Sequence, residues 1–161
     1  MAADFPPQVP ENLKVPETEV VALKALGKGK QIYGCKAKAD NPLQFEWALL
    51  RPQADLFDGR GEKIGSHFEG PTWEEPDGSK VVGAVQQRAN APKGNAVPWL
   101  LLKAKSNQGN GLFGHVTYIQ RVDTVGGAAP SSGCDKSSVG NEIQVDYQAD
   151  YYFYVHKPQG Q

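Results

Sequence analysis

The sequence has no excess of charge of either sign and no long apolar run. Its 17 lysine and arginine residues are balanced by 18 aspartate and glutamate residues, which leaves a net charge of -1. Such a chain has no long-range field with which to attract nucleic acid or an anionic membrane. No stretch approaches the roughly 18 apolar residues that a membrane-spanning helix needs. We therefore expect neither a nucleic acid partner nor a membrane span.

Long helices are not expected either. The chain contains 18 glycines and 12 prolines but a single methionine, a composition typical of many short elements separated by turns. Apolar and polar residues alternate with a period of two in several runs, most clearly over residues 143–155. These features predict an all-β fold, specifically an antiparallel β-sandwich or jelly roll with long loops.

The length of 161 residues fits one domain preceded by an arm. Residues 1–17 hold four prolines, which predict a Pro-rich N-terminal arm lying along the surface. Residues 18–161 predict a single β-sandwich domain. Within it we expect separate strands over residues 18–26 and 31–38, and an Asp- and Gly-rich loop over residues 54–61.

Only two cysteines are present, Cys35 and Cys134. Neither has a second cysteine or a histidine at the spacing of a structural zinc site. They are either unrelated buried thiols or the two halves of one disulfide, and the pairing of even numbers of cysteines in exported domains favours the disulfide. Residues 1–7 contain no apolar run that would serve as a secretory signal. The chain is therefore either cytosolic or the mature form of a secreted or periplasmic protein, with the leader absent, and the expected disulfide favours export.

Complete catalytic and nucleotide-binding motifs are missing. The segment Gly27-Lys-Gly29-Lys-Gln-Ile32 places isoleucine where a dinucleotide fingerprint needs its third glycine. No G-x-S-x-G elbow, Walker A loop, H-E-x-x-H pair or C-x-x-C pair occurs. The sequence therefore leaves open whether the protein is an enzyme.

Residues 66–85 carry the densest mixture of titratable and aromatic side chains and predict a β-hairpin, because Pro76-Asp77-Gly78 is a strong turn signal. Trp73 stands between two prolines, and we expect it to be an exposed ring that stacks on a sugar or another flat ligand. Trp47 alternates with Phe45 and Leu49, and Trp99 precedes three leucines, so both are expected in the core. From this stretch, His67, Glu69, Trp73 and Asp77 are predicted to bind the ligand.

Arg121 is the fifth predicted ligand-binding residue. It lies at the edge of a Gly- and Ser-rich segment, residues 123–141, which predicts a long loop. The arginine either clamps a ligand or forms a salt bridge with Asp123 that anchors this loop.

A metal site is an alternative interpretation of the same region. His67 and Glu69 lie two residues apart on a predicted strand and so share a face, and His115 on a second strand would complete a three-ligand site with an open position. A lone histidine on a strand usually forms only a hydrogen bond, so no cofactor is the default expectation and a transition metal the alternative. Without a metal, Glu69 with Asp77, or Glu74 with Glu75, is a candidate for a glycosidase-like carboxylate pair, although acidic residues beside a turn are normally solvated.

Several blocks of the sequence resemble the DUF3455 family, a domain of unknown function. They are QIYGC at residues 31–35, HFEGPTW at residues 67–73, PWLLL at residues 98–102, and the segment from Tyr118 to Cys134. The resemblance implies an exported protein, since members usually carry a leader before the Pro-rich arm. Some members carry a malate dehydrogenase label, which this chain does not support, because it has no nucleotide fingerprint and is too short for a nucleotide domain plus a substrate domain. The family brings no catalytic residues.

These observations predict an exported protein that acts as a ligand- or surface-binding module for a carbohydrate or another small ligand. The first alternative is a metal-dependent enzyme using His67, Glu69 and His115, and the second is a structural wall or matrix protein. The enzyme needs His67 and His115 in one coordination sphere, the binding module needs an exposed Trp73, and the structural protein needs neither. The oligomeric state is left open.

Overall fold

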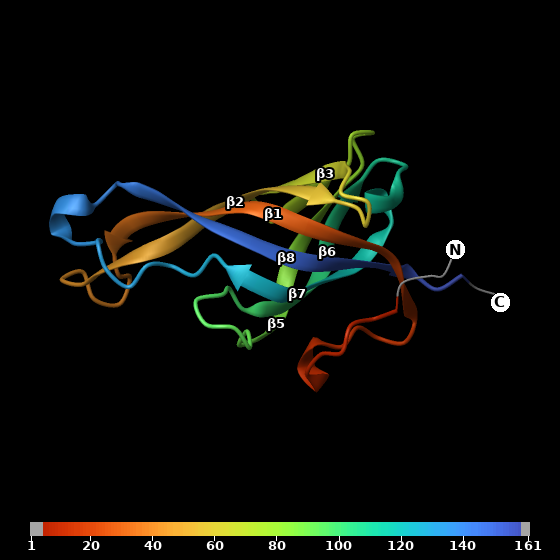
Figure 1. Cartoon of the computed structure of the whole chain (residues 1–161), viewed down its shortest axis with the longest axis horizontal. Helices are drawn as coiled ribbons and strands as arrows, with labels where there is room; N and C mark the ends of the chain where they lie inside the picture. Colours follow the sequence, from red (N-terminus) through yellow and green to blue (C-terminus); the bar gives the residue numbers. More distant parts are fainter. Residues whose placement is uncertain (1–4, 159–161) are drawn as a thin grey trace.

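The computed structural model describes residues 5–158. Eight antiparallel strands follow one another in sequence order around a closed barrel, in which β8 pairs with β1 (Figure 1). The strands are β1 (Glu19–Ala37), β2 (Phe45–Phe57), β3 (Lys63–Phe68), β4 (Thr72–Glu74), β5 (Lys80–Ala89), β6 (Trp99–Gln108), β7 (Val116–Gly126) and β8 (Glu142–His156). The predicted antiparallel all-β fold is confirmed. The strands close into a single barrel instead of the two packed sheets of a sandwich or jelly roll, because β1 pairs with both β2 and β8 and leaves the sheet without an edge.

β1 is one strand of 19 residues where two shorter strands were expected. Gly27 and Gly29 do not interrupt it, because they serve close packing and not a turn. A Cβ atom at Gly29 would lie 2.2 Å from the backbone oxygen of Gln53, and one at Gly27 would lie 2.5 Å from the ring of Tyr151. The two glycines therefore let β2 and an inward-pointing tyrosine approach β1.

The loop expected over residues 54–61 is shorter than predicted, since β2 continues to Phe57.

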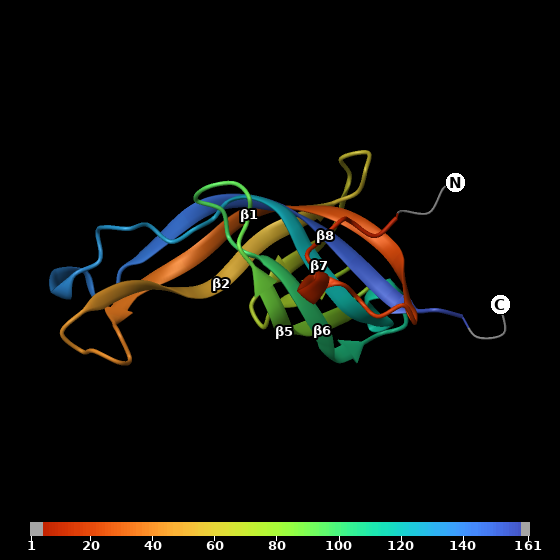
Figure 2. The same cartoon turned by 90° about the horizontal axis from the view of Figure 1, so that it is seen from below.

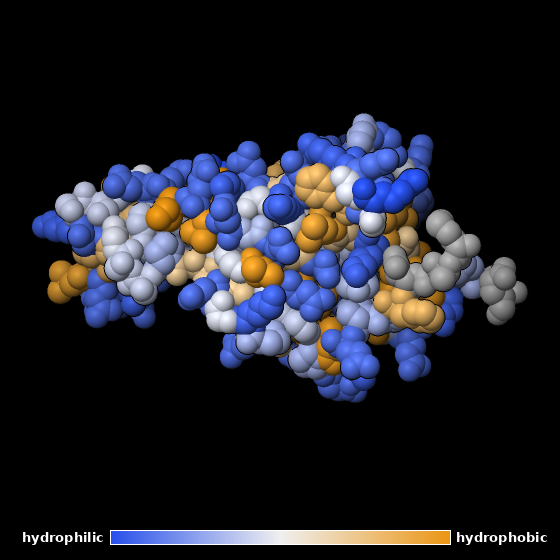
Figure 3. Space-filling view, in the orientation of Figure 1, coloured by the Kyte–Doolittle hydropathy of each residue, from blue (hydrophilic) through white to orange (hydrophobic). Residues whose placement is uncertain are grey.

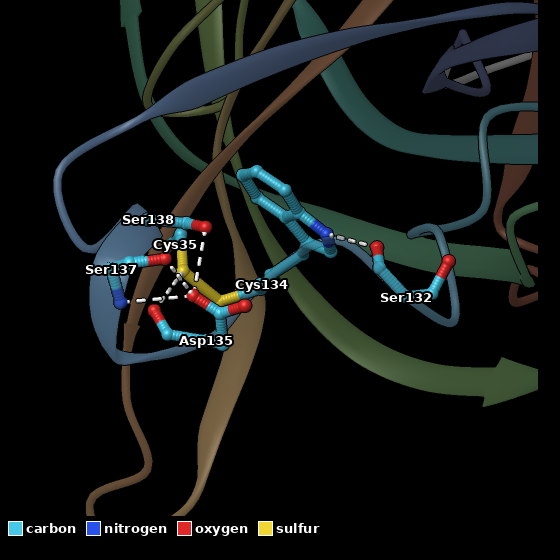
Figure 4. The surroundings of a disulfide bond; sticks show 7 residues. Cys35, Ser132, Cys134, Asp135, Ser137 and Ser138 are labelled. Carbon is cyan, nitrogen blue, oxygen red and sulfur yellow. Dashed lines mark hydrogen bonds between the residues drawn. A yellow bond between two sulfur atoms is a disulfide. The ribbon is translucent and has the colours of Figure 1, made fainter.

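A three-stranded ribbon made of parts of β1, β2 and β8 projects beyond the barrel (Figures 1 and 2). The predicted disulfide between Cys35 and Cys134 is confirmed and ties the loop of residues 127–141 to this ribbon. Figure 4 shows Asp135 next to the disulfide, where its carboxylate accepts hydrogen bonds from the backbone N–H of Ser137 at 2.9 Å and from the hydroxyl of Ser138 at 3.1 Å. The loop is therefore held by a covalent bond and by local hydrogen bonds.

The barrel end formed by the β2–β3, β4–β5 and β6–β7 connections is filled. A short 3-10 helix, η2 (Leu112–Gly114), places Phe113 inside this end with its side chain fully buried. The Phe113 ring lies 4.7 Å from that of Phe153, and its backbone N–H donates to Oε1 of Glu75 at 3.1 Å. This packing makes η2 a plug, so any internal space must lie toward the opposite end.

The N-terminal arm packs on the outer face of the barrel, over β5 to β8. Leu13, at the end of the 3-10 helix η1 (Glu11–Leu13), is fully buried, and its carbonyl oxygen accepts from Nε2 of Gln120 at 2.8 Å. The hydroxyl of Tyr154 donates to Oε1 of the same glutamine at 2.6 Å. Tyr152 and Tyr154 are therefore buried outside the barrel while their neighbours are buried inside it.

Two tryptophans lie outside the core in which they were predicted. Trp99 is half-buried and packs against the same outer cluster as Tyr152 and Tyr154. Trp47 is also half-buried, and its indole N–H donates to the carbonyl oxygen of Ser132 at 2.9 Å.

Within residues 5–158, no helix has the length and apolar character needed to cross a membrane.

Candidate functional site

A cavity of about 370 Å³ lies inside the barrel at the end opposite the plug. Its apolar wall includes Leu49, Leu50, Val85, Leu100 and Leu102. Leu49, Leu50 and Val85 are 54%, 45% and 41% exposed, so the cavity reaches the surface at these three residues. An eight-stranded barrel encloses enough space for a single small ligand, and the volume falls in the range of small-molecule pockets.

His67 faces this cavity from β3. Its ring stacks on that of Trp73 in β4, with 4.4 Å between the ring centroids. Nδ1 lies 2.9 Å from the carbonyl oxygen of Thr72, and since a carbonyl only accepts, Nδ1 carries the proton. Burial lowers the pKa of His67 to about 3. The imidazole is therefore neutral at ordinary pH, with Nε2 left as an acceptor.

Arg121 is the buried cation of the cavity. It lies in β7 and is 9% exposed, and its Nε donates to the carbonyl oxygen of Pro98 at 3.0 Å. Within the described part of the chain it forms no ion pair. The salt bridge considered with Asp123 is not formed, because a bulge follows Val122 and Asp123 is exposed with a φ of 50°. The terminal nitrogens of the guanidinium are therefore not neutralised by a carboxylate.

Gln31 is a further buried polar residue of the cavity. It is 1% exposed, and neither atom of its amide has a hydrogen-bond partner among residues 5–158. Nε1 of Trp73 is likewise buried without a partner. Leaving a buried donor or acceptor unpaired costs about 1–3 kcal/mol. Three of the four unpaired buried side-chain atoms in the described residues thus belong to the cavity wall, and the fourth is Nε1 of Trp99.

Two tyrosines, Tyr33 and Tyr151, complete the polar lining, and Tyr147 contacts Tyr151. The hydroxyl groups of Tyr147 and Tyr151 lie 3.0 Å apart, and that of Tyr33 donates to the carbonyl oxygen of Gly127. Burial raises the pKa of Tyr151, while the neighbouring Arg121 cation acts in the opposite direction. The pKa of Tyr147 is also raised by burial, and further by the hydroxyl of Tyr151. These phenols therefore remain protonated and add no negative charge beside Arg121.

Three of the predicted site residues, His67, Trp73 and Arg121, meet in this cavity. The expectation that Trp73 is exposed was wrong, since the side chain is 1% exposed. Thr72-Trp73-Glu74 forms the short strand β4, and the barrel turns the ring inward against His67, Tyr151 and Phe153.

The other predicted site residues lie outside the cavity. Glu69 is exposed in the β3–β4 turn. Asp77 is exposed in the β4–β5 turn, where its carboxylate accepts from the backbone N–H of Ser79 at 2.8 Å, which lowers the pKa of the aspartate. His115 is exposed beside η2. Glu69 and Asp77 therefore belong to turns at opposite ends of the barrel, which separates the two members of the carboxylate pair.

The proposed metal ligands are also separated. His67 is buried in the cavity, whereas Glu69 and His115 are exposed, and His115 lies at the plugged end. No group of three or more histidine, cysteine, aspartate or glutamate residues that would hold a metal ion occurs in residues 5–158.

Sequence reasoning missed Gln31 and Tyr151 as site residues. Both occupy strand positions that point into the barrel: Tyr151 on the buried face of β8, and Gln31 on the same face of β1 as Tyr33 and Cys35. The sequence signal for Gln31 was a single glutamine among apolar residues on the inward face of β1.

The fold and the cavity define a class of protein, a closed eight-stranded antiparallel barrel that is plugged at one end and hollow at the other. The chain belongs to the DUF3455 family, since the model described as "Protein of unknown function (DUF3455)" matches residues 16–155. The matched segment contains nearly all of the barrel, from β1 to the end of β8. No curated protein and no solved structure matches the chain significantly.

Proposed function

We propose that the protein binds one small, largely apolar ligand in the hollow end of the barrel. The observation that carries this proposal is the buried, unpaired amide of Gln31 in the wall of a cavity of about 370 Å³. A ligand with one or two polar groups would satisfy such an amide and cover the leucines around it.

The division of the barrel into two halves supports the same proposal. The plugged half is filled by aromatic rings such as Phe113 and Phe153, whereas the hollow half presents polar groups beside an apolar wall. Pockets for small molecules combine a mostly apolar lining with a few placed polar groups.

A binding site on the outer surface has less support. Trp73 is buried and offers no stacking platform to a carbohydrate. On the face shown in Figure 3, hydrophobic residues form separate patches between hydrophilic ones. The metal-dependent enzyme retains only His67 of its three ligands in the cavity, and a wall or matrix protein has no need of the cavity.

We also infer that the protein acts outside the cytosol, in a secreted or periplasmic setting. The disulfide between Cys35 and Cys134 supports this inference, because disulfides persist in oxidising compartments and are rare in the cytosol.

The proposal is tested with N-phenyl-1-naphthylamine, a neutral dye whose fluorescence rises in apolar surroundings. We expect saturable binding of one dye per chain. Val85→Trp, at the exposed rim of the cavity, should weaken binding by about tenfold or more by obstructing the entrance.

Val139→Trp is the matched control, because it adds the same side chain at a position that is 52% exposed and does not line the cavity. It should bind the dye like the unmodified protein. Absence of dye binding, or equal binding by the two variants, would overturn the proposal.

A further inference from the structure

We propose that the ligand is a monocarboxylate, an apolar molecule whose single carboxylate group binds the guanidinium of Arg121. This inference rests on the proposed function, because it names the chemistry of the ligand in the same cavity.

Arg121 is the first observation behind it. An arginine with 9% exposure has lost most of its contact with water, yet no carboxylate of the described chain neutralises it. Buried charges are normally paired, since burying an isolated charge is costly. Nε donates to the carbonyl oxygen of Pro98, and a side-chain hydrogen bond joins the guanidinium to Tyr151. Of the five N–H donors of the guanidinium, the remaining ones on the terminal nitrogens are available to a carboxylate.

The charges around the cavity favour a ligand with one negative charge. None of the residues lining the cavity is an aspartate or a glutamate. His67 is neutral, so Arg121 is the buried cation of the lining. The other two arginines of the lining lie toward the rim: Arg88 is exposed, and Arg51 is paired with Glu142 at 3.4 Å. A monoanion balances the one buried charge, whereas a phosphate monoester would bring a second charge without a buried partner.

Gln31 is placed to assist Arg121. Both residues lie beside Val97 and Pro98, which precede β6. Arg121 donates to the carbonyl oxygen of Pro98. Gln31 lies near Val97, because a Cβ atom placed on Gly127 would be 3.1 Å from Cγ1 of Val97 and 3.2 Å from Cγ of Gln31. The unpaired amide N–H groups of Gln31 therefore provide donors on the same side of the cavity as the guanidinium. The leucines of the wall would cover the apolar part of the ligand.

Displacement of bound N-phenyl-1-naphthylamine at neutral pH tests the inference. Three competitors share one ten-carbon chain and differ in head group: decanoate, decanamide and decyl phosphate. We expect decanoate to displace the dye at a concentration at least about tenfold lower than either of the others. Decanamide forms only neutral hydrogen bonds, which are roughly half as strong as charge-assisted ones, and decyl phosphate brings a second charge without a buried partner.

Arg121→Gln should abolish the preference for decanoate over decanamide, and Arg121→Lys should retain part of it. Arg60→Gln is the matched control, because it removes the same charge from an exposed turn outside the cavity and should leave the preference unchanged. The comparison of decanoate with decanamide on the unmodified protein decides the inference even if Arg121→Gln does not fold.

The outcomes separate the two proposals. If the dye does not bind, the proposed function fails and the inference fails with it. If the dye binds and decanamide or decyl phosphate displaces it at least as well as decanoate, ligand binding stands and the monocarboxylate is refuted. If a folded Arg121→Gln variant keeps the full preference for decanoate, Arg121 is not the group that binds the carboxylate.

Discussion

Acidification from about pH 6.5 to about pH 4 should destabilise the protein through His67. The folded imidazole has its pKa lowered to about 3 by burial, against 6.5 for the exposed group. In this window the unfolded chain therefore binds a proton that the folded chain does not, so the free energy of unfolding decreases as the pH falls. The slope approaches about 1.4 kcal/mol per pH unit, and the full effect, reached near pH 3, is on the order of 4–5 kcal/mol.

The measurement is urea-induced unfolding of the unmodified protein and of His67→Phe at several pH values. Phenylalanine keeps a ring against Trp73 and cannot titrate, but it loses the hydrogen bond to Thr72, so the variant should be less stable at neutral pH by about 1–2 kcal/mol. As the pH falls, the difference between the two proteins should shrink and then reverse. Carboxylates titrate in both proteins, and their contribution cancels in the comparison.

His115→Phe is the control, since it makes the same substitution at an exposed position at the plugged end, away from the cavity. Parallel curves for His67→Phe and the unmodified protein would refute the argument, because they would mean that the folded protein does not hold His67 neutral. An NMR titration of the His67 ring checks the same point directly.

Three further predictions concern the fold. Replacing Cys35 and Cys134 by serine should lower the free energy of unfolding by about 4–5 kcal/mol in the chain-entropy model, because the bridge spans 99 residues, and a loss below about 1 kcal/mol in denaturant unfolding would contradict it. Gly29→Ala should lower the melting temperature sharply, since its Cβ would lie 2.2 Å from a backbone oxygen of β2. Gly59→Ala is the control, because a Cβ there meets nothing within 4 Å, and equal melting temperatures for the two variants would refute the packing argument. Leu13→Ala should cost about 2–5 kcal/mol, and an unchanged urea midpoint would show that the arm does not pack on the barrel.

Local sequence patterns were sufficient to predict the strands but not their closure. The period of two in β8 and the Pro76-Asp77-Gly78 turn each follow from a few neighbouring residues, and both were predicted. Pairing of β1 with β8 joins residues more than a hundred positions apart, and no local pattern encodes it. Gly27 and Gly29 show the same limit, because a glycine needed for close packing is indistinguishable in the sequence from one needed for a turn.

The candidate site could be predicted only in part, because local sequence patterns do not show which side chains point into the cavity. His67 and Trp73 were found because polar and aromatic residues are dense in that stretch, and Arg121 because it adjoins a long loop. Density along the sequence also selected Glu69 and Asp77, which the turns place outside the cavity. Membership of the cavity depends on which face of a strand points inward and on which end of the barrel is filled, and both are set by the closed sheet.

The asymmetry along the barrel axis connects the stability of the fold with the proposed binding. A barrel interior filled only for stability would carry apolar side chains throughout, since an unpaired amide or an unneutralised guanidinium lowers the free energy of unfolding. This barrel has such packing around Phe113, and it places Gln31 and Arg121 where the interior remains hollow. Both destabilising groups thus lie in the wall of the cavity, which reaches the surface at the exposed rim, and a ligand that pairs with both would offset the cost of burying each.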